Sequence, residues 1–280
     1  MLNMIKMDLY RMFRTKSLYI IWIIMAMVLL FSTYMSKTEH DQMTKDISKY
    51  EEEMAEASSN TNVGMRIILP TKPGERVTVF DLFFANTQSK FITLFLVIFA
   101  VIFAASDINS GYIKNIGGQV KNRGKLICSK AASLGVFTVL SMALAVVTQA
   151  VSNRIFFGYL RWGDKKEFLL YLGIQMVLHF ALVLICMTIA VILRNNAISM
   201  VVAICLCMNL MMILYGVIDN GVKKMGIKDF QLVEHTVTGK ISLLSMAPGN
   251  KECISALGVA AVFIVIATLA GGLVFEKRDI

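Results

Sequence analysis

Apolar and polar residues follow each other along this chain in long blocks, and the apolar blocks predict helices that cross a membrane. Six blocks approach the length of about 20 residues that a helix needs to span the hydrocarbon core of a bilayer. The second block begins with a more polar half, up to Lys90. The predicted spans are Leu18–Met35, Val79–Ser106, Ala131–Ser152, Phe168–Leu193, Ala197–Ile218 and Ile254–Phe275.

Composition supports an all-α membrane protein. The chain has 280 residues, of which 56% are hydrophobic, and its mean hydropathy is +0.66. A soluble domain of this composition would expose too much apolar surface. Residues 18–280 are therefore expected to form one domain of six transmembrane helices.

The net charge of +9 predicts the topology, because Lys and Arg are densest in short segments beside the spans. By the positive-inside rule, residues 107–130 and both chain termini are cytoplasmic, whereas residues 36–78 and 219–253 lie outside. Basic residues placed in this way predict contact with membrane lipid and no nucleic-acid partner.

The segment before the first span, residues 1–17, has a helical pattern of its own. Leu2, Ile5 and Leu9 form one apolar stripe, and basic residues cover the other side. This pattern predicts an interfacial elbow helix with its cations near anionic headgroups. The alternative is a positive flank that only orients the first span.

The two outer segments also have helical patterns. In residues 36–78, apolar positions from Met43 to Met54 predict an amphipathic helix, followed by a turn at residues 70–74. This segment is either a small cap on the bundle or an outer gate that meets the cargo. In residues 219–253, apolar positions separated by glycines favour short helices at the outer interface.

No catalytic or metal-binding motif accompanies the spans. Residues 118–126 resemble a phosphate-binding loop, but five residues instead of four separate the glycines, and Leu126 stands where Ser or Thr would hold Mg²⁺. The three histidines are far apart, and among the five cysteines only Cys253 is expected near the outer face. We expect no metal, no cofactor and no enzyme activity in this chain itself.

Three polar side chains within the spans are candidates for lining a translocation path. Gln175 and His179 lie one helical turn apart on the same face of the fourth predicted span, and Asn209 is an amide deep in the fifth. Polar groups inside a bilayer face protein or water. The alternative is that they only form hydrogen bonds between helices.

The pattern of the cytoplasmic segment between the second and third spans predicts a short amphipathic helix. Ile108, Tyr112 and Ile116 recur at helical spacing, and Gly117 and Gly118 end the pattern. Such a helix has exposed apolar side chains and a basic rim, which suits docking to a groove on another protein.

The order Asp107, then Gly-Tyr-Ile-Lys-Asn, then Arg-Gly-Lys-Leu-Ile-Cys-Ser-Lys resembles the first cytoplasmic loop of ABC-2-type permeases, especially the Firmicutes exporters of peptides such as phenol-soluble modulins and lantibiotics. The resemblance implies that this loop is a coupling helix that docks on an ABC ATPase subunit. The docking residues it implies are Asp107, Ile108, Gly111, Tyr112, Ile113, Lys114, Asn115 and Arg123.

The same resemblance implies a multi-pass protein of a bacterial cell membrane, paired with a second permease copy or paralogue as a dimer. ATP and Mg²⁺ would be bound by the ATPase subunit, and the cargo would be an amphipathic or antimicrobial peptide. We expect a permease subunit that couples ATP hydrolysis in its partner to export. The alternative is a non-transporting immunity or sensor module that binds peptide at residues 36–78.

Overall fold

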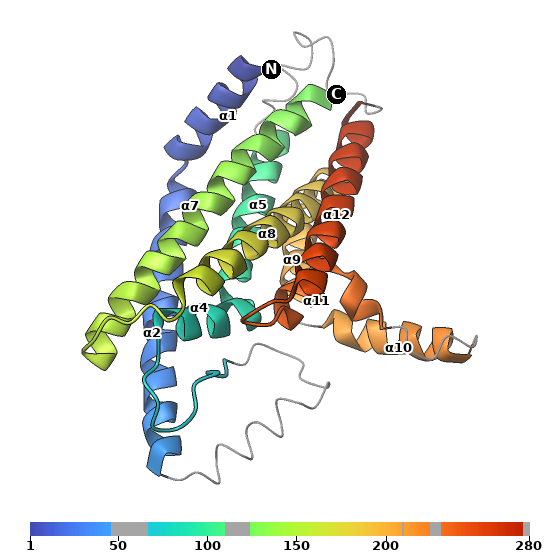
Figure 1. The fold of residues 1–280 in the computed structure, drawn as a ribbon. Helices are drawn as coiled ribbons and strands as arrows, with labels where there is room; N and C mark the ends of the chain where they lie inside the picture. The colour runs from blue at the N-terminus through green and yellow to red at the C-terminus, as the bar shows by residue number, and fades with distance from the viewer. Residues whose placement is uncertain (46–66, 110–123, 209, 225–230, 277–280) are drawn as a thin grey trace.

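The computed structural model describes residues 1–45, 67–109, 124–208, 210–224 and 231–276, and over these residues the regular secondary structure is helical throughout (Figure 1). The all-α prediction is therefore confirmed. The helices are α1 (Leu2–Arg14), α2 (Lys16–Lys45), α4 (Val79–Gln88), α5 (Phe91–Asn109), α7 (Gly124–Phe157), α8 (Lys165–Leu193), α9 (Asn196–Cys207), α10 (Met211–Lys224), α11 (Val237–Leu243) and α12 (Asn250–Glu276), with the 3-10 helix η1 (Leu232–His235) before α11.

Four of the described helices, α2, α7, α8 and α12, are long and apolar enough to cross a membrane. The bent pair α4 and α5 provides a fifth if the two count as one span. The chain therefore has the character of a multi-pass membrane protein.

Helix α8 forms the centre of the bundle. It packs most extensively against α12 and α5, and it also contacts α7, α9 and α11. Helix α2 packs along α7 at one side, and α1 contacts the first turns of α7 (Figure 1). Among the four long spans, α8 is the most buried and α12 the least.

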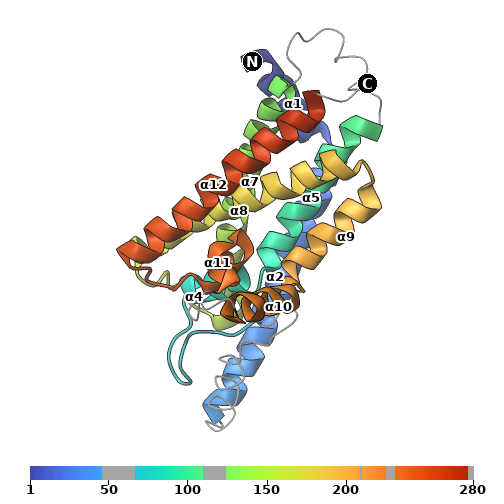
Figure 2. The same cartoon turned by 90° about the vertical axis from the view of Figure 1, so that its right-hand side faces the viewer.

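Two views of the bundle show that its connections gather at two opposite ends (Figures 1 and 2). The end that we call the α1 end holds α1, the last turns of α5 and α12, and the start of α7. The opposite end, called the α11 end, holds α4, α10 and α11. Segments predicted on one side of the membrane thus lie together at one end of the molecule.

Aromatic side chains fill the core along α8. Phe80 and Phe83 of α4 contact Tyr171 of α8, with ring centroids 5.6 and 6.4 Å from the Tyr171 ring. Elsewhere in the core, the ring centroids of Phe99 of α5 and Phe137 of α7 are 4.2 Å apart. Aromatic pairs at such distances contribute about 0.5–1.5 kcal/mol each beyond their burial.

The second predicted span is broken. Helices α4 and α5 are bent by 55° at Ser89 and Lys90. The expected wetter first half is also wrong, because every residue from Val79 to Thr87 is buried. A capping box fixes the start of α4: Thr78 accepts from the Asp81 N–H, and the Asp81 carboxylate accepts from the Thr78 N–H.

The fifth predicted span is not one long helix. Helix α9 ends at Cys207, and α10 lies across the α11 end of the bundle in a different direction from α9 (Figures 1 and 2). Polar contacts hold α10 there. The Asp219 carboxylate accepts from the Leu232 N–H at 2.8 Å, and the Tyr215 hydroxyl lies 3.3 Å from the Thr238 hydroxyl.

The first span extends ten residues beyond its predicted end, since α2 continues from Met35 to Lys45. Its last turns project beyond the bundle (Figure 1). The extension is anchored at His40, which is buried and whose Nε2 lies 3.1 Å from the Glu75 carbonyl oxygen. Most of the predicted amphipathic helix, residues 46–54, falls outside the described residues.

Candidate functional site

A lysine is buried at the bend between α4 and α5. Ser89 donates its hydroxyl to the Ala85 carbonyl, which satisfies the end of α4, and Lys90 takes a left-handed backbone conformation with φ of 63°. The Lys90 carbonyl then accepts from the Leu94 N–H and begins α5. This backbone conformation is unfavourable for lysine and favours glycine. The packing of the surrounding residues must therefore stabilise Lys90 in it.

The Lys90 side chain is only 2% exposed. Lys90 and Ser89 join the two bent helices, so the buried lysine lies where α4 meets α5. It is close enough to His179 of α8 and Cys207 of α9 to interact with them electrostatically. A cation inside a membrane span is costly and marks a functional site by default.

His179 connects α8 to α5 next to this lysine. Its ring is fully buried, with Nδ1 2.8 Å from the Gln175 carbonyl oxygen and Nε2 2.7 Å from the Thr93 hydroxyl. A carbonyl oxygen only accepts, so Nδ1 carries a proton. In the neutral ring, Nε2 then accepts from Thr93. The histidine thus joins two spans one turn beyond the bend.

Gln175 connects the same helix to α11. Its side-chain amide donates to the Tyr171 hydroxyl at 3.0 Å and to the Ile241 carbonyl at 3.1 Å, whereas its buried Oε1 has no hydrogen-bond partner among the described residues. A buried acceptor without a partner is rare and costs about 1–3 kcal/mol. The site therefore retains an unused acceptor.

A second polar contact joins α4 to α2. The Ser32 hydroxyl donates to Asn86 Oδ1 at 2.7 Å, and the Asn86 amide donates to the Leu82 carbonyl. The adjacent Thr33 donates to Gln149 of α7 at 3.0 Å, and the buried Gln149 Nε2 has no partner within the described parts of the chain. Polar side chains therefore join α2 to α4 and α2 to α7 on one side of the bend, and α5 to α8 on the other. We call Lys90, Thr93, Gln175 and His179, with Asn86 and Ser32, the internal polar cluster.

The interhelical hydrogen bonds that the sequence suggests for Gln175 and His179 are present. Asn209, the third predicted path residue, lies outside the described residues, as do Gly111, Tyr112, Ile113, Lys114, Asn115 and Arg123 of the predicted dock. Asp107 and Ile108 fall in the last turn of α5, but their side chains are not described.

Sequence reasoning missed Lys90, Thr93, Asn86 and Ser32. The signal for Lys90 was a charged residue between two apolar runs, which was instead interpreted as the polar beginning of a span. Ser and Thr are common within spans, so Thr93 and Ser32 carry no distinctive signal until the helices are packed.

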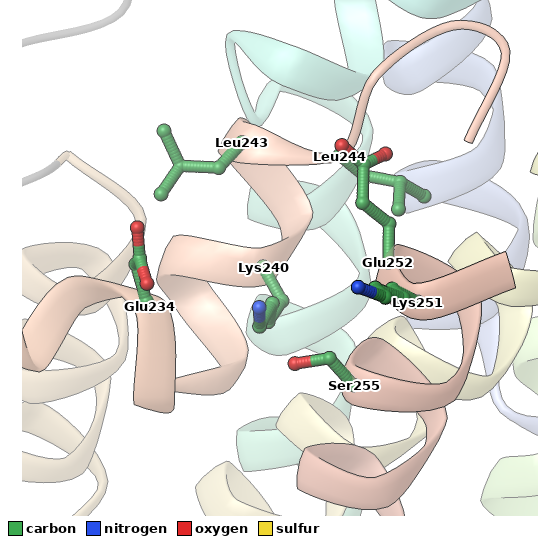
Figure 3. A pocket seen from close by; sticks show the side chains of 7 residues that line it. All are labelled: Glu234, Lys240, Leu243, Leu244, Lys251, Glu252 and Ser255. Atoms are coloured by element: carbon green, nitrogen blue, oxygen red, sulfur yellow. The ribbon is translucent and has the colours of Figure 1, made fainter. Parts of the chain in front are cut away.

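A surface pocket lies at the α11 end, separate from the internal polar cluster (Figure 3). Its volume is about 290 Å³, and it lies between η1, α11 and the first turns of α12. Among the described residues no group of three or more His, Cys, Asp or Glu side chains is placed to hold a metal ion. The pocket is lined by Glu234, Lys240, Leu243, Leu244, Lys251, Glu252 and Ser255.

Comparisons with known proteins correct the resemblance stated above. The family model described as "Protein of unknown function (DUF2705)" matches residues 55–280. A search of curated proteins finds no match. The resemblance to ABC-2-type permeases is wrong, because it depended on one short loop at residues 107–130, whereas the family match spans most of the chain and nothing in it indicates such a permease. Over that length the chain belongs to the family described as a protein of unknown function, DUF2705.

Proposed function

We propose that this chain is the membrane-spanning subunit of a transporter, and that the bend between α4 and α5 is its moving part. The observation that carries the proposal is Lys90, a lysine buried at a break in a span. Broken spans that carry polar groups at membrane depth are characteristic of substrate and coupling sites in transporters.

The contacts around the bend suggest how a movement would spread. Helix α5 is tied to α8 through Thr93 and His179, and α8 is tied to α11 through Gln175 and Ile241. A rotation of α4 against α5 needs backbone changes only at Ser89 and Lys90. The unpartnered Gln175 Oε1 and Gln149 Nε2 are groups that an altered arrangement, or a cargo, would satisfy.

The remaining parts of the proposal rest on expectations from the sequence alone: apolar blocks and charge for the crossings, and an apolar pattern with a basic rim at residues 107–130 for docking to a partner protein. The protein is proposed to cross a bacterial cell membrane six times with both termini inside, α9 and the residues after it forming the shortest crossing. Energy would come from a separate ATPase subunit bound at residues 107–130, with a second copy or paralogue completing a dimer. An amphipathic peptide is the proposed cargo, moved outward.

Replacing Lys90 tests the transport proposal. Lys90→Met keeps the length of the side chain and the same backbone strain but removes the charge, so the amount of folded protein should be unchanged. Export of a fluorescent amphipathic peptide from cells that express the chain with its ATPase should fall at least about tenfold, equivalent to about 1.4 kcal/mol. Lys90→Arg retains the charge and serves as control. Unchanged export by the Lys90→Met chain would exclude a role of this lysine in transport.

The ATPase partner is tested by co-expression and affinity capture. We expect Tyr112→Ala and Lys114→Glu to reduce both capture of the ATPase and stimulation of its activity, because these side chains form the predicted docking helix. ATP hydrolysis by the purified chain alone would contradict a separate ATPase.

A sensor that does not transport is a second candidate, favoured by the projection of α2 beyond the bundle (Figure 1). Deleting residues 43–57 separates the two functions. A sensor would lose peptide binding while ATPase capture remains, and no export would be measurable in the parent chain.

A further inference from the structure

The pocket at the α11 end has a polar part and an apolar part. Figure 3 shows the Lys240 and Lys251 amines and the Ser255 hydroxyl around the same space, with Lys240 contributed by α11 and the other two by α12. Leu243 and Leu244 add apolar atoms to the lining, from opposite sides of the end of α11, and Leu243 is 50% exposed. An occupant would need an anionic group between the lysines and apolar atoms beside them.

The two carboxylates of the pocket differ in their surroundings. Glu252 accepts a hydrogen bond from the Ser245 hydroxyl and points toward Leu244 in Figure 3, away from the lysine amines. Glu234 stands on η1, at the far side of the pocket. The space between Lys240 and Lys251 is therefore bordered by two cations and one hydroxyl, a set of donors that suits a phosphate diester.

The pocket opens onto the apolar face of α12. Along the helix from Lys251 and Ser255, the next residue on the same face is Gly258, where an added Cβ would meet no atom within 4 Å. Exposed apolar residues follow at helical spacing: Val262, Val265, Leu269 and Leu273 are each more than half exposed. The polar pocket thus continues into an apolar strip that begins with open space.

The position of the pocket along α12 agrees with a polar group at the membrane surface and apolar atoms beside it. Helix α12 begins with Asn250, Lys251 and Glu252 and is apolar from Cys253 to Phe275, so the lysines lie at the boundary between its polar turn and its membrane-length part. We infer that this pocket binds the headgroup of an anionic glycerophospholipid, with an acyl chain lying along Gly258 and the exposed strip of α12. The inference is independent of the transport proposal.

Binding of short-chain phosphatidylglycerol to the purified full chain in detergent, measured by calorimetry, tests the inference. The double variant Lys240→Gln/Lys251→Gln should weaken binding about 30-fold, taking about 1 kcal/mol for each cation near a lipid surface. The matched control is Lys165→Gln/Lys166→Gln, which removes two exposed lysines at the start of α8, at the same end of the bundle. It should leave the affinity unchanged.

Two further measurements distinguish binding of a lipid from binding of a free anion. Inorganic phosphate offers the charge without the chain and should bind far more weakly than the lipid. Gly258→Leu fills the space below Ser255 at an exposed helical position and should weaken lipid binding several-fold without changing the charge. Equal loss in the control variant, an unchanged affinity in the double variant, or phosphate binding as tight as lipid binding would each overturn the inference.

Discussion

At the scale of single residues, the contact between Thr93 and His179 is the most informative, because one hydroxyl provides the hydrogen bond to a buried ring nitrogen. Thr93→Val keeps the shape of the side chain and removes the donor, so His179 Nε2 is left without that partner. Interhelical hydrogen bonds in membranes contribute about 0.6 kcal/mol on average and up to about 1.7 kcal/mol. We expect a loss of stability within that range, measured by unfolding in mixed micelles.

Thr138→Val is the control for this substitution. Thr138 is equally buried, but its hydroxyl donates to the Leu134 carbonyl within α7, a bond inside one helix. Its replacement should cost less, because the carbonyl keeps its bond within the helical backbone. Equal losses in both variants would show that the contact between α5 and α8 contributes no specific stabilisation.

A second prediction at this scale concerns Gly239, in the first turn of α11. The chain of η1 passes so close that a Cβ on this residue would fall on the Val233 carbonyl oxygen. Gly239→Ala should therefore displace η1 from α11 and destabilise the protein by more than about 1 kcal/mol, the size expected when overpacking meets backbone.

The same substitution should also disturb the pocket, because Glu234 of η1 and Lys240 of α11 line it. Gly258→Ala is the matched control, since its added Cβ meets no atom and alanine favours a helix. Thermal unfolding of both variants in detergent shows whether only Gly239→Ala destabilises the protein. A Gly239→Ala chain as stable as the parent would mean that η1 does not rest on α11.

At the scale of elements, the apolar blocks predicted where helices occur but did not predict where they break. Neither break contains glycine or proline: α4 ends at Gln88 and is followed by Ser89 and Lys90, and α9 ends at Cys207. A left-handed lysine is unfavourable by itself, so tertiary packing must impose this bend. Local sequence therefore carries no reliable signal for it.

The prediction of where helices end failed for a related reason. Polarity placed the end of the first span at Met35, yet α2 continues because Ser36 and His40 are buried against the rest of the chain. For the candidate site, Gln175 and His179 stood out as large polar residues in an apolar run. Their partners, Thr93 and the Ile241 carbonyl, depend on which helices become neighbours, which the sequence pattern does not specify.

At the scale of the whole molecule, the distribution of burial is informative. Helix α8 holds the polar contacts and is surrounded by other helices, whereas α12 and α2 expose broad apolar faces. An exposed face such as Ile254, Leu269 and Leu273 is stable in lipid and would be an aggregation site in water. The bundle therefore has an apolar core that contains the internal polar cluster, and an apolar exterior.

The grouping of connections at two ends makes the topology testable in one experiment. Cysteines would be introduced singly at exposed lysines, Lys6 and Lys125 at the α1 end, and Lys166 and Lys251 at the α11 end. The parent for this test would have its partly exposed cysteines, Cys128, Cys205 and Cys253, replaced by alanine.

We expect a membrane-impermeant maleimide to label Lys166→Cys and Lys251→Cys on intact cells, and Lys6→Cys and Lys125→Cys only after permeabilisation. The physical reason is that Lys and Arg are densest in the short segments predicted at the α1 end, which the positive-inside rule places on the cytoplasmic side. Labelling of Lys6→Cys on intact cells would reverse the orientation and place the proposed lipid pocket on the inner leaflet. Labelling of Lys125→Cys and Lys251→Cys from the same side would contradict the separation of the two ends, because α12 and α7 would then not both cross the membrane.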